Sequence, residues 1–275
     1  MLVVVTQIPF VLTIWYSFQK WVLINPVPAR FGGFSNYDAI VADPMFRAAL
    51  LNTAYLTVGA VIVSVVIGLV FAVLLNSAFP GRSVVRTLVI APFLIMMSAT
   101  SLLWKSMILD PTFGLVDWAL KLFGVHPIAW LTRFALPSVI ATVSWHYAPF
   151  AMLIILAGLQ SLPPDIIEAA QVDGAGWASR FAHVVFPFLR QYIELAVLFG
   201  SMFILASFSA IAIMTQGGPG NDTMTIPYYV YEIAFEGFNI GQAAAAGVIV
   251  VGIVIIIASV LLRVVASIFR SQERW

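Results

Sequence analysis

Residues 161–190 read SLPPDIIEAAQVDGAGWASRFAHVVFPFLR and form a polar insertion in an otherwise hydrophobic chain. Ser161 is suited to cap a helix N-terminus, with Pro163 and Pro164 in the first turn, where proline is tolerated. The pattern therefore predicts a short helix over Ile166 to Val172.

Two glycines and a proline divide the rest of this stretch. Gly174 and Gly176 would end the first helix, because glycine accepts a left-handed backbone. A second helix from Trp177 to Phe186 would follow, closed by Pro187. A helix-turn-helix of this size on a membrane surface has the shape needed to dock in a cleft of another protein.

Six apolar segments make up most of the remaining sequence. A membrane helix needs about 20 mostly apolar residues, so 275 residues allow about six crossings and little else. The composition agrees, because 62% of the residues are hydrophobic and only 9% are charged, against about 25% charged in soluble domains. We therefore expect an all-α membrane protein with six transmembrane helices in a single domain over residues 1–275. The segments are Leu2 to Phe18, Ala54 to Leu75, Leu88 to Leu103, Ala135 to Gly158, Ile193 to Met214 and Ala243 to Val265. The first has no basic region before it, so we interpret it as a span and not a secretory signal.

Several classes of function are excluded by what the sequence lacks. No Gly-x-x-x-x-Gly-Lys-Ser/Thr run is present to cradle phosphates, so any ATP-driven work falls to a partner. The net charge of +1 is too balanced for a nucleic-acid binder. With no cysteine and three histidines that share no ligand spacing, no metal site is expected. No Ser-His-Asp arrangement or Gly-x-Ser-x-Gly elbow is present either, so we expect no catalytic residues.

The basic residues indicate the orientation in the membrane. The connections after the second and fourth segments and the C-terminal tail carry seven, against six on the other side, Lys105 among them. The larger set lies in short connections near span ends, where the positive-inside rule applies most strongly. We therefore expect both termini in the cytoplasm, with the long connections Asn25 to Asp43 and Gln216 to Gly241 outside. The larger set is Arg82, Arg86, Arg180, Arg190, Arg263, Arg270 and Arg274.

The polar insertion carries a specific motif. Glu168-Ala169-Ala170 is followed after three residues by Gly174, and after nine more by Val184-x-Phe186-Pro187. This pattern resembles the Glu-Ala-Ala loop of permease subunits of binding-protein-dependent ABC importers. That family favours Ile-x-Leu-Pro at the end, so Val184 and Phe186 are conservative departures.

The resemblance extends to the sugar-transporting branch of that family. The external connection Thr215 to Phe235 contains a Gly-Gly-Pro segment followed by tyrosines and a phenylalanine, which is similar to that branch. Asn36-Tyr37, Asp43-Pro44-x-Phe46 and Asn52-Thr53 are likewise typical of carbohydrate permeases. Together these matches cover nearly the whole chain.

The resemblance implies a type I ABC importer permease fold and a set of partners. These are a second permease subunit in a heterodimer, two ATPase subunits, an extracytoplasmic substrate-binding protein and the lipid bilayer of a bacterial or archaeal cytoplasmic membrane. ATP and magnesium would be bound by the ATPase, so this chain needs no cofactor. Residues 161–190 would be the coupling loop that docks on the ATPase. The residues implied in that contact are Glu168, Ala169, Ala170, Asp173, Gly174 and Pro187.

The resemblance also points to a substrate pathway. In maltose-type permeases the ligand is contacted about twenty residues before and about thirty-five after the loop glutamate. Counting from Glu168, these positions are Tyr147, Phe150, Phe203, Ile204 and Ser207. Phe203 and Ser207 share a helix face, and a sugar needs both an aromatic surface and hydroxyl partners. Packing or lipid contact is the alternative explanation of these aromatic residues.

The charges within the spans favour a neutral substrate. The middle of the fourth and fifth segments contains no Lys or Arg to hold an anion. Glu194 lies four residues after Arg190, so a helical ion pair is expected. His146 neighbours Tyr147, and we interpret it as a satisfied buried residue.

The sequence thus predicts a non-catalytic importer subunit for a neutral sugar, oligosaccharide or polyol. An importer of glycerol phosphate or another small polar solute is an alternative, because the second permease could supply the missing charge. An ion-coupled secondary transporter is an alternative of another class, although such proteins carry intramembrane acids and repeated halves. An intramembrane enzyme would need a catalytic constellation that the spans lack.

Overall fold

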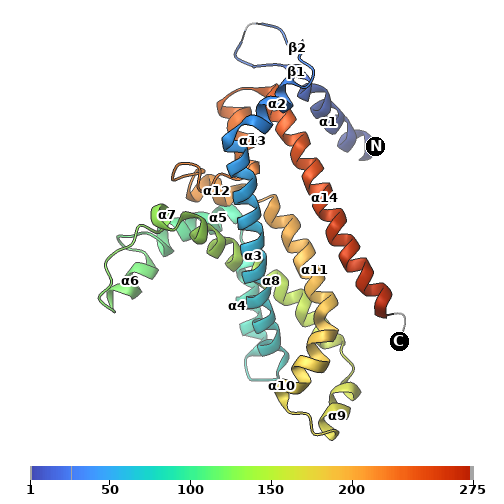
Figure 1. Ribbon diagram of the computed structural model, residues 1–275. Coiled ribbons are helices and arrows are strands. Elements are labelled where there is room, and N and C mark those ends of the chain that lie inside the picture. Colours follow the sequence, from blue (N-terminus) through green and yellow to red (C-terminus); the bar gives the residue numbers. More distant parts are fainter. Residues whose placement is uncertain (1, 26, 273–275) are drawn as a thin grey trace.

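The computed structural model describes residues 2–25 and 27–272, which are almost entirely helical. Figure 1 shows long helices running between an end with a small hairpin, which we call the external end after the predicted orientation, and an opposite end formed by α9 and α10. The N-terminal half contains α1 (Leu2–Ser17), β1 (Gln19–Lys20), β2 (Arg30–Phe31), α2 (Ser35–Ala42), α3 (Pro44–Asn76), α4 (Arg82–Leu94), α5 (Met97–Leu103), the π-helical turn η1 (Trp104–Ile108), α6 (Leu115–Lys121) and α7 (Trp130–Arg133). The C-terminal half contains α8 (Ala135–Ser161), α9 (Pro164–Val172), α10 (Trp177–Arg180), η2 (Phe181–Val185), α11 (Phe186–Leu205), α12 (Ser209–Met214), α13 (Ile226–Tyr231), η3 (Glu232–Glu236) and α14 (Ile240–Gln272).

Among the residues that the structure describes, three helical runs are long and apolar enough to cross a membrane by themselves. They are α3, α8 and the continuous run Trp177–Leu205, which joins α10, η2 and α11. At 33 residues, α3 is about 50 Å long. It begins sharply because Asp43 Oδ1 accepts a hydrogen bond from Met45 N at 2.8 Å and Pro44 occupies the first turn. The second and fourth predicted segments are therefore confirmed as continuous helices.

The third predicted segment, Leu88 to Leu103, is wrong as a single helix. The chain leaves the helix at Ile95 and Met96, which are extended, and the two halves meet at 99°. Pro92 lacks a backbone donor, so the end of α4 is weakened three residues before the break. The hydrophobicity of a segment predicts that it avoids water, but it does not predict whether the segment forms one continuous helix.

The fifth predicted segment, Ile193 to Met214, is also interrupted. The helix ends at Leu205, and α12 begins at Ser209 after a short break. The two interrupted spans meet at their external halves, where α12 packs against α5. Lys105 Nζ donates to the carbonyl of Ile213 at 2.8 Å, so the ammonium group satisfies a free carbonyl at the C-terminus of α12.

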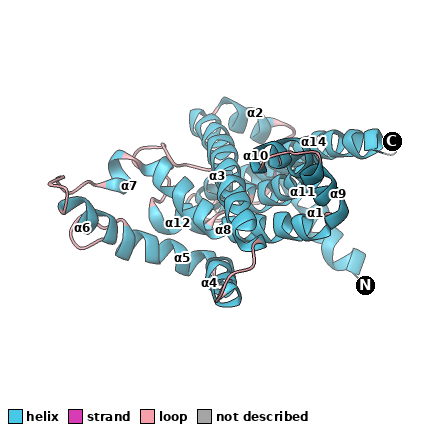
Figure 2. Ribbon diagram, turned by 90° about the horizontal axis from the view of Figure 1, so that it is seen from below, coloured by secondary structure: helices cyan, strands magenta, loops and turns pink. Residues whose placement is uncertain are grey.

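The first and last helices lie together beside the other spans. Figure 1 shows α1 and α14 running in opposite directions, and they pack against each other. Figure 2, the view from below, shows α6 at one edge, both chain ends at the other, and α3, α8 and α11 between them. The four alanines Ala243–Ala246 at the start of α14 are all buried, which allows close approach to α2 and α13.

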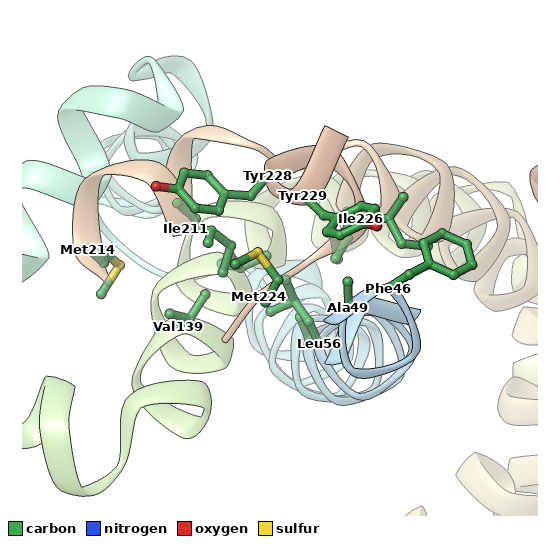
Figure 3. Packing of buried hydrophobic residues seen from close by; sticks show 14 of the residues in the cluster. Phe46, Ala49, Leu56, Val139, Ile211, Met214, Met224, Ile226, Tyr228 and Tyr229 are labelled. Atoms are coloured by element: carbon green, nitrogen blue, oxygen red, sulfur yellow. The ribbon is translucent and has the colours of Figure 1, made fainter. Parts of the chain in front are cut away.

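The core has two parts, one at each end of the α3 and α8 pair. The external part combines α3, α8, α12 and α13, with Tyr229 as its largest fully buried side chain (Figure 3). The other part contains Met152, Ile155 and Leu189. Between the two parts the helices approach closely at Gly68, where a Cβ atom would lie 2.8 Å from Ala151 Cβ and from Met152 N.

The two external motifs of the sequence bind each other. Asn52 Nδ2 donates to Asn221 O at 2.7 Å, and Ile226 N donates to Thr53 Oγ1 at 2.9 Å. The Tyr229 hydroxyl donates to Asp43 Oδ2 at 2.6 Å. The Gly-Gly-Pro connection is therefore fixed on the external end of α3.

The contact at Gly68 leads to a stability prediction. Gly68→Ala should lower the melting temperature of the purified protein in detergent, because the new methyl meets backbone atoms and overpacking costs about 1–3 kcal/mol. Gly200→Ala is the matched control, since its Cβ meets only Val61 Cγ2 at 3.9 Å. In the control the gain in helix propensity, about 1 kcal/mol, should dominate. Equal or higher stability of the Gly68 variant would contradict the close packing.

Candidate functional site

The helix α9 projects from the end opposite the hairpin (Figure 1). None of its residues is buried, and its main packing partner among the described helices and strands is α10. Apolar side chains in α9 and α10 are exposed. Val172 of α9 is 88% exposed and Trp177 of α10 is 66% exposed. A short projecting helix with exposed apolar groups is a candidate interaction site for another protein.

The boundaries of α9 differ in part from the sequence prediction. The helix over Ile166 to Val172 is confirmed, and it begins at Pro164 after an extended Pro163. Ser161 is not its N-cap. It is the last residue of α8, and its hydroxyl donates to Gly158 O at 2.9 Å.

The end of α9 forms a Schellman motif. Ala175 N donates to Ala170 O and Gly174 N donates to Gln171 O, both at 3.0 Å. Gly174 has φ +79°, with open space around the position of a Cβ. Asp173 is the C-cap residue, and it lies between the Glu168-Ala169-Ala170 motif and this turn. The three residues between Ala170 and Gly174 thus place the glycine at the position where this cap requires a left-handed backbone.

The predicted second helix, Trp177 to Phe186, is wrong at its C-terminal end. The helix continues through Pro187 into α11, and a π-helical turn, η2, precedes the proline. Proline cannot donate to the preceding turn, and the wider turn accommodates that missing hydrogen bond. Pro187 therefore lies within the base of a membrane helix and not at a helix end.

The helices on either side of α9 are joined by Tyr192. A Cβ at Gly158 of α8 would lie 2.5 Å from ring atoms of Tyr192 of α11, so the ring fits only against a glycine. The Tyr192 and Ser161 hydroxyls are 2.8 Å apart and share a hydrogen bond. The two ends of residues 161–190, the predicted coupling loop, which we call the coupling segment, are thereby held close to each other.

Charged residues surround the base of this segment. Gln160 Oε1 accepts from Arg82 Nη2 at 3.2 Å and from Arg86 Nη2 at 3.1 Å when its amide is oriented toward them. The expected ion pair of Arg190 with Glu194 is confirmed at 2.9 Å. Arg82, Arg86 and Arg190 therefore lie at the end of the molecule from which α9 projects, near the end of α8 and the start of α11.

Three of the five predicted pathway residues meet in one aromatic cluster. The rings of Tyr147 and Phe203 are parallel within 5°, with centroids 6.1 Å apart. Phe150 meets Phe203 edge to face at 5.5 Å. Phe203 is 45% exposed. The cluster thus joins α8 to α11 and presents one aromatic ring at the surface of this chain.

The other two predicted residues lie beside the cluster. Ile204 is 1% exposed and belongs to the core. Ser207 is 8% exposed and sits in the break between α11 and α12, where its Oγ has no hydrogen-bond partner in the described chain. Irregular backbone at membrane depth is tolerated where it lines a cavity or is covered by protein.

Two further aromatic residues complete the cluster and were not identified from the sequence. Phe93 of α4 contacts Phe150 at 5.3 Å and Tyr147 at 6.2 Å. Phe199 contacts Phe150 at 6.4 Å. Phe199 lies four residues before Phe203, so the sequence could have placed both on one face of a helix. Nothing in the sequence relates Phe93 to α8.

The cluster lies between the two interrupted spans. Phe93 precedes the break at Ile95 and Met96, and Phe203 precedes the break at Ala206. His146 is 5% exposed, with Nδ1 3.4 Å from Thr100 Oγ1, as expected of a satisfied buried residue. Across the described residues, no group of three or more His, Cys, Asp and Glu side chains could hold a metal ion.

These features define an all-helical membrane permease with a short projecting helix, α9, at one end. Residues 64–271 match the model of the family described as "Binding-protein-dependent transport system inner membrane component". The chain belongs to this family of ABC importer permeases, so it is a transmembrane subunit and not an enzyme.

Individual relatives agree with this assignment. The chain is 32% identical to the trehalose/maltose transport system permease protein MalF of Thermococcus litoralis, over 86% of this chain and 78% of the relative. It is 30% identical to the sulfoquinovosyl glycerol transport system permease protein SmoG of Agrobacterium fabrum, over 94% and 84%. The fold resembles a chain of a bacterial ABC transporter involved in import of the acidic polysaccharide alginate, with a TM-score of 0.77 and 22% identity over 99% and 91%.

The turn after α9 leads to a test of coupling. Gly174→Val should leave the protein in the membrane but stop transport, because a left-handed conformation costs an L-residue roughly 1–2 kcal/mol and the cap would rearrange. Gly81→Val is the matched control, since Gly81 also has a left-handed backbone (φ +80°) in open space. Uptake and association with the ATPase are the measurements. Normal uptake by the Gly174 variant would contradict the role of this turn.

Proposed function

We propose that this chain is the membrane subunit of an ATP-driven importer for a neutral sugar, oligosaccharide or polyol. The observation that carries the proposal is the contact of Tyr192 with Gly158 and Ser161, which joins α11 to the end of α8, the two helices that flank the exposed helix α9 and bear the aromatic cluster. A movement imposed on α9 by an ATPase would thus reach Tyr147 and Phe150 on α8 and Phe203 on α11.

The residues of the coupling segment have distinct parts in this mechanism. Glu168 is exposed and supplies a carboxylate for a charge-assisted contact with the ATPase. Ala169 and Ala170 keep this face of the helix thin enough to enter a cleft. Asp173 and Gly174 form the turn, and Pro187 lies at the base of α11. Closure of the ATPase would then move α8 and α11 and change access to the cavity from one side to the other.

The aromatic cluster supports a carbohydrate as substrate. Sugar rings have apolar C–H faces that pack on aromatic rings, and hydroxyl groups that require polar partners. The Tyr147 hydroxyl and the unpartnered Ser207 Oγ would supply such partners. Ile204 would hold α11 in place through its packing in the core. The relative from Thermococcus litoralis is named for trehalose and maltose.

The charge of the substrate is the finer part of the proposal. Neither α8 nor the membrane part of α11 beyond Arg190 carries a Lys or Arg, and Lys105, in the span that carries Phe93, donates to Ile213 O. This favours a neutral solute. The relative named for sulfoquinovosyl glycerol keeps open the alternative of an anionic solute such as glycerol phosphate, with the compensating charge on a second permease.

The proposal includes an assembly and an orientation. The partners are a second permease, two ATPase subunits that bind ATP and magnesium, and an extracytoplasmic binding protein, with no cofactor in this chain. Both termini would face the cytoplasm of a bacterium or archaeon. The Arg82, Arg86 and Arg190 side chains around α9 support the cytoplasmic location of this end.

Co-purification tests the assembly. The detergent-solubilised complex should contain an ATPase and a second permease, and calorimetry on the accompanying binding protein should show tight binding of a neutral sugar or polyol. Tight binding of glycerol phosphate would reject the neutral substrate and favour the alternative. Purification of this chain as an active transporter without an ATPase would favour an ion-coupled mechanism and reject the proposal.

The aromatic cluster gives a separate prediction for transport. Phe203→Ala should raise the substrate concentration needed for half-maximal uptake by about tenfold, because one stacking contact is worth about 0.5–1.5 kcal/mol beyond the area that it buries. Tyr55→Ala is the control, as Tyr55 is an aromatic residue of α3 that is 61% exposed and makes no ring contact in the described chain. Equal uptake curves for both variants would remove the cluster from the pathway.

A further inference from the structure

A polar pocket lies at the external end of the molecule, away from the aromatic cluster. It has a volume of about 490 Å³, which is within the usual range of small-molecule sites. Its walls come from the β1–β2 hairpin, the start of α2 and the start of α14. The residues that matter below are Lys20, Trp21, Arg30, Ser35, Asn36 and Gln242.

Two cations face each other across the hairpin at this pocket. Lys20 and Arg30 are direct partners in the antiparallel register, an arrangement of like charges that destabilises a strand pair. The stem of Lys20 lies over Gly32, where a Cβ atom would be 2.6 Å from Lys20 Cγ. Neither cation forms an ion pair with any residue that the structure describes, and the pocket lining contains no carboxylate.

The start of α14 adds to the positive potential. Asn239 Oδ1 accepts from Gln242 N at 3.1 Å and caps the helix. Gly241 N donates to Trp21 O at 3.1 Å, and this close approach requires glycine because a Cβ would lie on Gln19 O. The positive end of the helix dipole is therefore held at the pocket beside Lys20 and Arg30.

The buried side of the pocket offers acceptors instead of charge. Asn36 is 6% exposed, and its Nδ2 donates to Ser17 O and Gln19 O, both at 2.8 Å. Its Oδ1 therefore remains as an acceptor, and no described residue donates to it. Ser35 lines the same side, and its Oγ also lacks a partner in the described chain. A ligand that satisfies this pocket carries an anionic group at the cations and a hydroxyl or amine donor at Asn36.

We propose that this pocket binds a glycerol phosphate group, with the phosphate at Lys20 and Arg30 and a glycerol hydroxyl donating to Asn36 Oδ1. Arg and Lys are the residues that bind phosphate oxygens by charge-assisted hydrogen bonds. The group has two sources, the headgroup of phosphatidylglycerol in the outer leaflet and free glycerol phosphate. The connection around the pocket exposes Leu23, Ile24, Phe31 and Phe34 by 55–71%, which favours the lipid because these side chains would enter the membrane interface.

The binding test uses the full-length chain, purified with the subunits that accompany it. In one arm, native mass spectrometry counts phosphatidylglycerol retained from nanodiscs that also contain phosphatidylcholine. In the other, calorimetry measures sn-glycerol 3-phosphate binding in detergent without lipid. Three variants are compared with the wild-type protein: Lys20→Gln with Arg30→Gln, Gln242→Glu, and Lys121→Gln as a control on the distant helix α6.

The expected results separate the two sources. Loss of both cations should weaken binding about tenfold or more, because it removes the charge-assisted hydrogen bonds to the phosphate. Gln242→Glu should weaken it as well while preserving the fold, because a glutamate near a helix N-terminus is favourable. The control should bind like wild type. Selective retention in the first arm supports the lipid, and binding in the second supports the free ester. No binding in either arm, or binding that is equal in all variants, overturns the proposal.

Discussion

The contact of the Tyr192 ring with Gly158 is the constraint on which the proposed mechanism depends. A glycine at this position lets α11 approach the end of α8, and the hydrogen bond between Tyr192 and Ser161 fixes the approach. The segment between these residues leaves the membrane part of the chain and returns to it at nearly the same place. In the proposed mechanism a movement of α9 therefore reaches α8 and α11 together, through the packing of α9 on α10 and the helix that runs from α10 into α11, and these two helices carry the aromatic cluster.

The helix breaks explain why the cluster lies where it does. Each break ends a helix just after an aromatic residue, Phe93 in one span and Phe203 in the other. The external halves, α5 and α12, then pack together and are joined by Lys105. The external end is further fixed by Asp43, Asn52 and Thr53 on the Gly-Gly-Pro connection. A rigid external end and a movable α9 are the two parts that alternating access requires.

The sequence predicted local features well and continuity of the backbone poorly. The cap at Gly174 and the pair of Arg190 with Glu194 depend on residues close in the chain, so their patterns are visible directly. The break after Leu94 has one local signal in Pro92, whereas no comparable residue marks the break after Leu205, and the packing of α5 against α12 beyond the two breaks joins residues far apart in the chain. Tyr147, Phe150 and Phe203 could be predicted from the family resemblance, because they lie at set distances along the chain from Glu168. Phe93 could not be predicted, because nothing in the sequence relates α4 to α8. The helix continues through Pro187 because a π-helical turn precedes it, and a proline in the sequence does not indicate such a turn.

Distances between spin labels would test the central claim most directly, and a chain without cysteine gives no background labelling. Labels at Gln171 in α9, Leu153 in α8 and Met202 in α11 occupy accessible positions. The account predicts that the distances from Gln171 to the other two stay the same when the complex binds ATP, while access of a water-soluble relaxation agent to Met202 changes. A change in either distance, or unchanged access at Met202, would contradict a rigid connection between the coupling helix and the aromatic cluster.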